Sequence, residues 1–309
     1  MSFLKYEFKK CPQCGSKSVK KDGKNRQGIQ RYRCRECNKR FQSAKRNTNT
    51  ILIEYVLGKQ TYKQIYKKYG LNHKQIQKLI DNISLDLPKI TPRTCVIGID
   101  TTWFGDLGLT LVRDLTNKEN LRWRFVSREQ QLTYSQLVEE CVERGVTLLG
   151  IVADGKDSFF HSFGSVPIQM CQFHMAHILR RYLTKNPNLE CNKELWKLWY
   201  TRENYNQYTF RIALLKWFLK HSHELVQGYI REDTNTWEYS KERTLKAYKS
   251  LVRFTRYLFT YQTSRWIPNT NNSLEGVNSD LKNKIRNHNG LRWDRRARVI
   301  HFYLLNQSN

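Results

Sequence analysis

The spacing of apolar residues changes twice along the chain. Between residues 51 and 83 apolar side chains recur at helical intervals in three short groups. From residue 94 to about 170 they form short continuous runs, such as TCVIGIDTTWF and TLLGIVADG, which are typical of strands buried on both faces. From about 190 to 262 the helical spacing returns. The pattern predicts three short helices, then a region of strands, then a long helical segment.

The three short helices have the plan of a helix-turn-helix. Gly70 suits a left-handed turn after the second helix, and Asn72 suits the N-cap of the third. In this plan the last helix lies in the major groove of DNA. Four side chains of that helix are expected to face away from the core and to reach bases or phosphates: His73, Lys74, Gln77 and Lys78. The alternative is a three-helix packing unit with no role in DNA binding.

The strand region predicts three strands, a helix over 132 to 144, a fourth strand and a fifth in VPIQMCQFH. This is the order of an RNase H-like α/β fold with a mixed sheet, in which the first and fourth strands are neighbours. The helix is expected to turn one set of apolar side chains inward: Leu132, Leu137, Val138, Cys141 and Val142.

Two carboxylates interrupt this apolar region, Asp100 in the first strand and Asp154 at the end of the fourth. A buried strand does not tolerate a lone charge. If the two strands are neighbours, both acids lie at one edge of the sheet, where a divalent cation between them relieves their repulsion. Magnesium, or manganese in its place, prefers such oxygen ligands.

Charge indicates the class of partner. The chain carries 54 Lys and Arg against 27 Asp and Glu, a formal net charge of +27. Such a surplus favours a polyanionic partner, most simply nucleic acid, although a merely basic surface is the alternative. Aromatic residues at 13% exclude a disordered basic tail. No run approaches the roughly 20 apolar residues that span a bilayer, and there is no signal-peptide core, so we expect a cytoplasmic, nucleoid-associated protein without a membrane partner.

Four of the eight cysteines form two CxxC pairs with nineteen residues between them. Two residues between thiolates let both sulfurs face one tetrahedral ion, and two such pairs at this separation predict a zinc ribbon rather than a redox pair. The predicted zinc ligands are Cys11, Cys14, Cys34 and Cys37.

Four sequence blocks carry a resemblance to a known family. GIDTTWF, VADGKDSFF, CQFHMAHILRR and NNSLEGVNSDLK, in that order, resemble the blocks of DDE transposases of the Mutator-like group and their bacterial insertion-sequence relatives. The resemblance implies Asp100, Asp154 and Glu275 as the catalytic acids that hold the cation. It implies an all-helical insertion between the second and third acids. Cys171 and His174 match the family's CxxH pair, and we expect them to support the active site rather than to bind a second zinc.

Glu275 has two interpretations. Asn272 and Glu275 have the spacing of a capping box, which would make Glu275 part of a helix cap. The apolar residues Leu274, Val277 and Leu281 instead place Glu275 beside the core, where the resemblance locates the third ligand, and we favour the metal. Other acids are expected in turns or on exposed helix faces: Asp106, Asp114, Asp157 and Asp280.

We therefore divide the chain into a zinc ribbon at 1–45, a helix-turn-helix at 46–92, catalytic segments at 93–188 and 264–309, and a helical insertion at 189–263. The expected function is a transposase that binds the terminal inverted repeats of its element and cuts and joins DNA by two-metal phosphoryl transfer, as a homodimer or higher oligomer on element ends and target DNA. Backbone contacts near the cut are expected from Lys282, Lys284 and Arg286. The alternatives are a non-catalytic regulator derived from a transposase and an RNase H-like nuclease.

Overall fold

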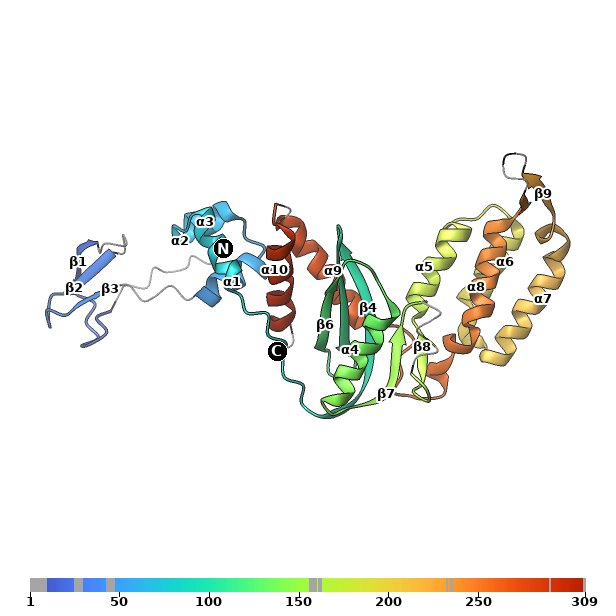
Figure 1. The fold of residues 1–309 in the computed structure, drawn as a ribbon, viewed down its shortest axis with the longest axis horizontal. Coiled ribbons are helices and arrows are strands. Elements are labelled where there is room, and N and C mark those ends of the chain that lie inside the picture. The colour runs from blue at the N-terminus through green and yellow to red at the C-terminus, as the bar shows by residue number, and fades with distance from the viewer. Residues whose placement is uncertain are drawn as a thin grey trace. The chain divides into compact units, whose positions relative to one another are not determined.

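The computed structural model describes residues 10–24, 30–42, 48–155, 160, 163–231, 233, 236–288 and 290–307. Contacts between residues divide the chain into two compact units, Met1–Asn82 and Ile83–Asn309. Figure 1 shows the elements of both units.

The first unit contains a small sheet and three helices. The strands β1 (Val19–Lys24), β2 (Gln30–Cys34) and β3 (Arg40–Gln42) pair in that order, each antiparallel to the next. The helices are α1 (Thr48–Val56), α2 (Tyr62–Tyr69) and α3 (His73–Asp81).

The turn between α2 and α3 is as predicted. Gly70 ends α2 in the left-handed conformation with φ of 63°. Asn72 caps α3 and forms a capping box with Gln75. Because glycine has no Cβ, the left-handed turn carries no steric penalty there. Buried isoleucines from the three helices, Ile51, Ile65 and Ile76 among them, form the helices' core.

The second unit is built on a five-stranded mixed sheet in the order β6-β5-β4-β7-β8. The strands are β4 (Arg93–Phe104), β5 (Leu107–Asp114), β6 (Glu119–Val126), β7 (Val146–Ala153) and β8 (Ile168–Met170). Strand β5 is antiparallel to β4 and β6, whereas β7 is parallel to both β4 and β8. Ile99 pairs with Ala153, so Asp100 and Asp154 follow at the same end of neighbouring strands. The predicted mixed α/β class is confirmed.

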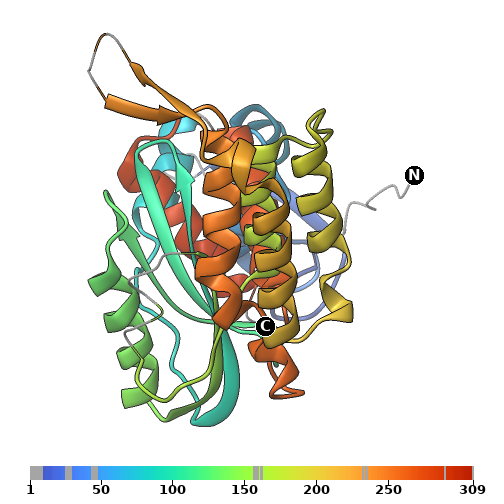
Figure 2. The ribbon, with the colours of Figure 1, turned by 90° about the vertical axis from the view of Figure 1, so that its right-hand side faces the viewer.

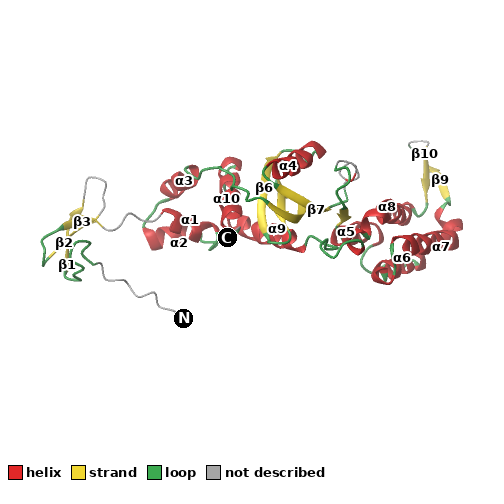
Figure 3. Ribbon diagram, turned by 90° about the horizontal axis from the view of Figure 1, so that it is seen from below, coloured by secondary structure: helices red, strands yellow, loops and turns green. Residues whose placement is uncertain are grey.

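Helices cover both faces of this sheet, with α4 (Gln131–Glu143) on one face and α9 (Asn272–Ile285) on the other (Figure 3). Helix α10 (Trp293–Asn306) packs against α9 and β6. Helix α4 has the predicted position, but its predicted inward face is wrong at both ends, since Leu132 and Val142 are 63% and 49% exposed. Tyr134 is buried instead, and its hydroxyl lies 2.7 Å from Thr101 Oγ1, which anchors the helix on β4.

The segment between β8 and α9 is mainly helical, with α5 (Gln172–Leu183), α6 (Glu190–Tyr200), α7 (Gln207–Leu225) and α8 (Glu242–Leu258) lying alongside one another (Figures 1 and 2). Short 3-10 helices follow α6, α8 and α9: η2 (Arg202–Asn204), η3 (Thr260–Gln262) and η4 (Arg286–His288). The predicted fifth strand is shorter than expected, because the CQFH part of VPIQMCQFH starts α5.

The prediction of an all-helical insertion is wrong. Strands β9 (Gly228–Arg231) and β10 (Thr236–Tyr239) form an antiparallel hairpin that extends beyond the ends of α7 and α8 (Figure 2). Gly228 weakens helix formation after α7, and the aromatic and β-branched residues of both strands favour extended backbone.

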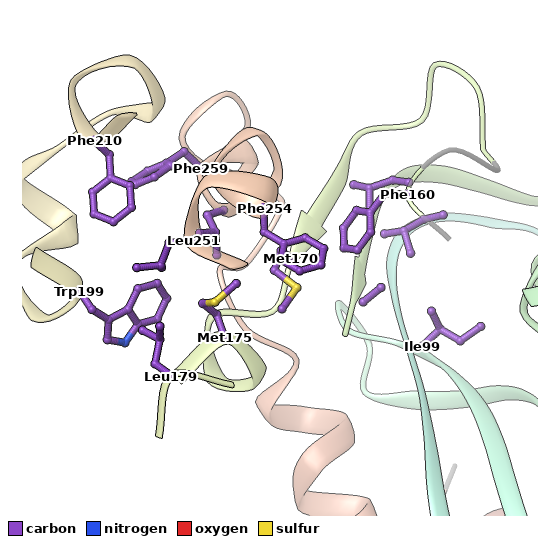
Figure 4. Packing of buried hydrophobic residues seen from close by; sticks show 14 of the residues in the cluster. Ile99, Phe160, Met170, Met175, Leu179, Trp199, Phe210, Leu251, Phe254 and Phe259 are labelled. Carbon is purple, nitrogen blue, oxygen red and sulfur yellow. The ribbon is translucent and has the colours of Figure 1, made fainter. Parts of the chain in front are cut away.

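One hydrophobic core continues from the sheet into the helices (Figure 4). Phe160 and Met170 lie on the sheet side of Phe254, and Trp199 and Phe210 lie on the other. Trp196, Trp199 and Trp217 belong to this core, whereas Trp237 is 56% exposed. Within the described residues no helix is both long and apolar enough to cross a membrane.

Candidate metal centres

The four predicted zinc ligands come together in the ribbon. Their Sγ atoms all lie within 4.8 Å of one another, with Cys11 and Cys34 buried. The Sγ atoms of Cys11 and Cys37 are 3.5 Å apart, and those of Cys14 and Cys34 are 3.6 Å apart. Burial opposes ionisation of Cys11, but backbone N–H groups, first that of Cys14, outweigh it and lower the Cys11 pKa to about 7. The donor set and its compactness fit tetrahedral zinc.

A second candidate site lies where β4, β7 and α9 approach one another. Asp100 comes from β4, Asp154 directly follows β7, and Glu275 is in the first turn of α9. All three line one cavity of about 600 Å³, together with His174 of α5. The three acids therefore border one cavity, although the first and the last of them are 175 positions apart in the sequence.

The charges of these acids oppose one another. Asp100 is only 7% exposed, and burial raises its pKa well above the usual range, with further increases from the charges of Asp154 and Glu275. Without a cation the pocket therefore favours the protonated form of Asp100. A bound divalent cation reverses that preference, because it compensates the buried negative charge.

The geometry separates the two interpretations of Glu275. The N-cap of α9 is Asn271, and no side chain makes a capping hydrogen bond there. The capping box that Asn272 and Glu275 could form is absent from this helix start. Glu275 Oε1 instead lies 3.2 Å from His174 Nε2. Glu275 thus faces the cavity and does not act as a cap.

His174 belongs to this centre more closely than its CxxH spacing suggested. One oxygen each from Asp100 and Glu275 and one ring nitrogen of His174 all lie within 4.8 Å of one another. Burial lowers the His174 pKa, an effect that the charge of Glu275 opposes. A neutral imidazole can either donate to Glu275 or offer a lone pair to a metal.

Two further side chains hold the site in place: Asn278, which sequence reasoning missed, and Cys171, which it expected near the acids. Asn278 Nδ2 donates to Asp100 Oδ2 at 3.0 Å, one turn after Glu275 on α9. Cys171 Sγ donates to Asn271 Oδ1 at 2.9 Å and so fixes the start of α9 against α5. Burial raises the Cys171 pKa to about 11, which keeps it a thiol donor. The helical spacing from Glu275 to Asn278 was the only signal that could have identified Asn278.

The residues present fit a divalent cation. Glu275 Oε1 and Asn278 Oδ1 are buried, and neither accepts a hydrogen bond from a described residue, although His174 Nε2 lies 3.2 Å from Glu275 Oε1. Buried polar oxygens without partners are costly unless something else satisfies them. Carboxylate oxygens around an open cavity suit a hard cation that keeps positions for water or phosphate.

Three of the competing acids, those that the structure describes, lie outside this cavity. Asp106 lies in an exposed turn, and Asp280 accepts a hydrogen bond from Tyr303 at 2.8 Å. The expectation for Asp114 is wrong: it ends β5, is fully buried and accepts hydrogen bonds from the backbone N–H groups of Thr116 and Asn117. Asp157 lies outside the described residues.

The candidate DNA contacts differ in accessibility. On α3, His73, Lys74 and Lys78 are exposed and Gln77 is half-buried, with the His73 ring packed edge-on against Tyr62. On α9, Lys282 is exposed and lines the cavity of the three acids. Arg286, at the start of η4, is also exposed. Lys284 differs, because its side chain is 13% exposed and its Nζ lies 3.6 Å from Asp280.

A comparison with protein families agrees with the ribbon. Residues 10–38 match the family model of the InsA N-terminal domain, a zinc ribbon. The match supports zinc at the four cysteines, a relation to insertion sequences and DNA as a partner. No curated protein matched the chain.

Proposed function

We propose that this chain is a DDE transposase of the Mutator-like type, which binds the terminal inverted repeats of its element and cuts and joins DNA strands with magnesium or manganese. The observation that carries the proposal is the convergence of Asp100, Asp154 and Glu275 on one cavity. A ribbon that resembles an insertion-sequence domain supports DNA as the substrate.

The strand order supports an RNase H-like fold for the second unit. Three antiparallel strands, β4 to β6, are followed by α4 and then by β7, which pairs in parallel with β4. The first and fourth strands of this sheet are thus neighbours; Asp100 lies within β4 and Asp154 directly follows β7, each one residue beyond the pair Ile99 and Ala153.

Each residue of the cavity has a definable task. Asp100, Asp154 and Glu275 would hold the metal, which supplies positive charge to activate the attacking hydroxyl and to stabilise the leaving oxygen. Asn278 orients Asp100 through its amide hydrogen bond. His174 orients Glu275, or shares its ion, from 3.2 Å. Lys282 at the cavity wall would bind a phosphate oxygen.

DNA recognition is assigned to the first unit. The exposed side chains of α3 would read the element end, with the ribbon adding phosphate contacts. Joining two ends requires at least two copies of the chain on DNA, so we propose a dimer or higher oligomer in the DNA complex.

The test is cleavage of end-labelled DNA that carries the sequences flanking the gene. We expect cutting and joining in magnesium and none in EDTA. Asp154→Asn should abolish both, while Asp233→Asn should leave them unchanged, because Asp233 is an exposed acid between β9 and β10 that lies outside the cavity. Undiminished cutting by Asp154→Asn would reject the proposed centre, and specific binding without any cutting by the unaltered chain would favour the regulator.

A further inference from the structure

Two further cavities adjoin the cavity of the three acids. A cavity of about 250 Å³ shares Lys282 with the acid cavity and is also lined by Trp103 and Arg286. A third, of about 420 Å³, shares Phe104 and Arg296 with the second and is also lined by Trp293. Together they form a groove that starts at the acids, follows α9 and ends at the first residue of α10. We call it the α9 groove.

Positive charge lies along the middle of the α9 groove. Lys282 and Arg286 are exposed, and neither forms an ion pair with any residue in the described part of the chain. Lys284, two positions from each, turns to Asp280 instead. Of these three cations, the two that line the groove are therefore the two without an acidic partner. They suit phosphates on a strand that leaves the acid cavity.

Exposed aromatic side chains line the same groove. Trp103 is 38% exposed and Trp293 is 68% exposed. Large aromatic surface in water is unfavourable unless a ligand covers it. Unpaired bases stack on such rings regardless of sequence, whereas bases inside a duplex cannot reach them. Cations for phosphates together with aromatic platforms for bases are the combination that binds single strands.

The length of the groove limits how much DNA it holds. The part of the groove along α9, from Glu275 to Arg286, is about 16 Å long at a helical rise of about 1.5 Å per residue. At the roughly 3.4 Å per nucleotide of stacked bases, this part holds four or five nucleotides, and Trp293 lies beyond it.

We propose that the α9 groove binds at least about four to five unpaired nucleotides of the DNA strand next to the phosphate at the acids, with bases on Trp103 and Trp293 and phosphates on Lys282 and Arg286. The proposal rests on the proposed function and extends it, because it implies that the duplex opens beside the cut.

The experiment measures binding without cleavage. The full chain in EDTA is titrated with a six-nucleotide DNA strand that contains 2-aminopurine, whose fluorescence falls on stacking. Trp293→Ala and Trp103→Ala should each weaken binding about tenfold, since each removes an aromatic ring on which one base stacks. Trp237→Ala is the matched control, because Trp237 is 56% exposed on the β9–β10 hairpin and lines none of the three cavities. Circular dichroism verifies that each variant is folded.

The outcomes separate this proposal from the proposed function. Unchanged binding by both Trp103→Ala and Trp293→Ala, or an equal loss in Trp237→Ala, overturns the α9 groove. An equal loss of affinity for a fully paired duplex also overturns it, because the groove would then hold paired DNA. If the short strand binds as expected but the unaltered chain never cuts DNA, the groove stands and the transposase assignment fails.

Discussion

The two candidate metal centres are built in opposite ways. The ribbon takes four thiols from residues 11 to 37, a local stretch, and these thiols can fill all four positions of a tetrahedral ion. The acid centre takes its ligands from three elements across residues 100 to 275 and borders a cavity of about 600 Å³. A closed site with four protein ligands supports a fold, whereas an open site leaves positions for a substrate. This difference matches the proposed function, in which the first ion is structural and the second would be catalytic.

The largest expected effect tests the closed site. Cys34→Ser should release zinc and unfold the ribbon, since structural zinc contributes about 10–16 kcal/mol of apparent binding free energy to such modules. Zinc content per chain and protease resistance of residues 10–42 measure the effect, and the melting of the second unit should not change. Cys191→Ser, a buried cysteine of the second unit, is the control and should keep its zinc. A full zinc equivalent in Cys34→Ser contradicts the four-cysteine site.

The next effect tests the open site. Glu275→Gln should reduce DNA cleavage by more than about 100-fold, because removing even a residue behind a metal ligand costs 10–100-fold. DNA binding and melting should hardly change, since no side-chain cap is lost from α9. Glu190→Gln is a matched control, as Glu190 also lies in the first turn of a helix, α6. A variant that cuts normally but loses about 1 kcal/mol of stability would restore the cap interpretation.

A smaller effect tests whether repulsion between the acids of the open site destabilises the folded chain. The pKa of Asp100 is raised in the folded chain, so folding favours the protonated carboxyl. Its contribution to stability is therefore fully present below the pKa of the unfolded chain. It is lost as the pH rises through the pKa of the folded chain. At pH 8 without divalent ions, Asp100→Asn should therefore have a higher melting temperature than the unaltered chain. A gain of about 1 kcal/mol in stability corresponds to about 2–4 °C. Magnesium should stabilise the unaltered chain and not the variant.

Thermal melting at pH 8 and at pH 4 provides the internal control for this prediction. The difference between the two chains should shrink at pH 4, where both carry a neutral side chain at position 100. A variant that melts below the unaltered chain at pH 8 in EDTA would falsify the account of charge repulsion at this site.

The smallest effect concerns the open space beside Glu275. A Cβ added at Gly276 would meet no atom within 4 Å, so packing does not require glycine there. Gly276→Ala should raise stability by about 0.5–1 kcal/mol, the usual difference between the two residues inside a helix. Gly150→Ala is the contrasting control, because its Cβ would lie 2.6 Å from Ile267 Cδ1 and should destabilise the chain. Urea denaturation compares them, and a loss of stability in Gly276→Ala would contradict an open site.

Local features were the ones that the sequence could predict. The CxxC spacing identified the four thiols, and Gly70 and Asn72 marked the turn between α2 and α3, because each signal lies within a few residues. The identity of the acids came from a resemblance rather than from a local pattern. Even so, the order of the strands was enough to expect Asp100 and Asp154 at one sheet edge.

The sequence did not predict which side chains from distant segments contact one another. His174 meets Glu275 across 101 positions, and no spacing rule connects them. Leu132 and Val142 have apolar side chains at helical spacing, yet the hydrogen bond from Tyr134 to Thr101 sets which face of α4 is buried. The β9–β10 hairpin was missed because its few residues follow directly on the apolar pattern of α7. Tertiary packing decides such cases, and it can override local preference.

The order of the ligands along the chain has a consequence for synthesis. The cysteines and α3 leave the ribosome first, and Glu275 follows Asp154 by 121 positions. At about 5–20 residues per second, the third acid emerges roughly 6–24 s after the second. During that interval the nascent chain has all four thiols of the ribbon but lacks the third acid. Under the proposed function, translation therefore delays cutting until α9 has folded against the sheet.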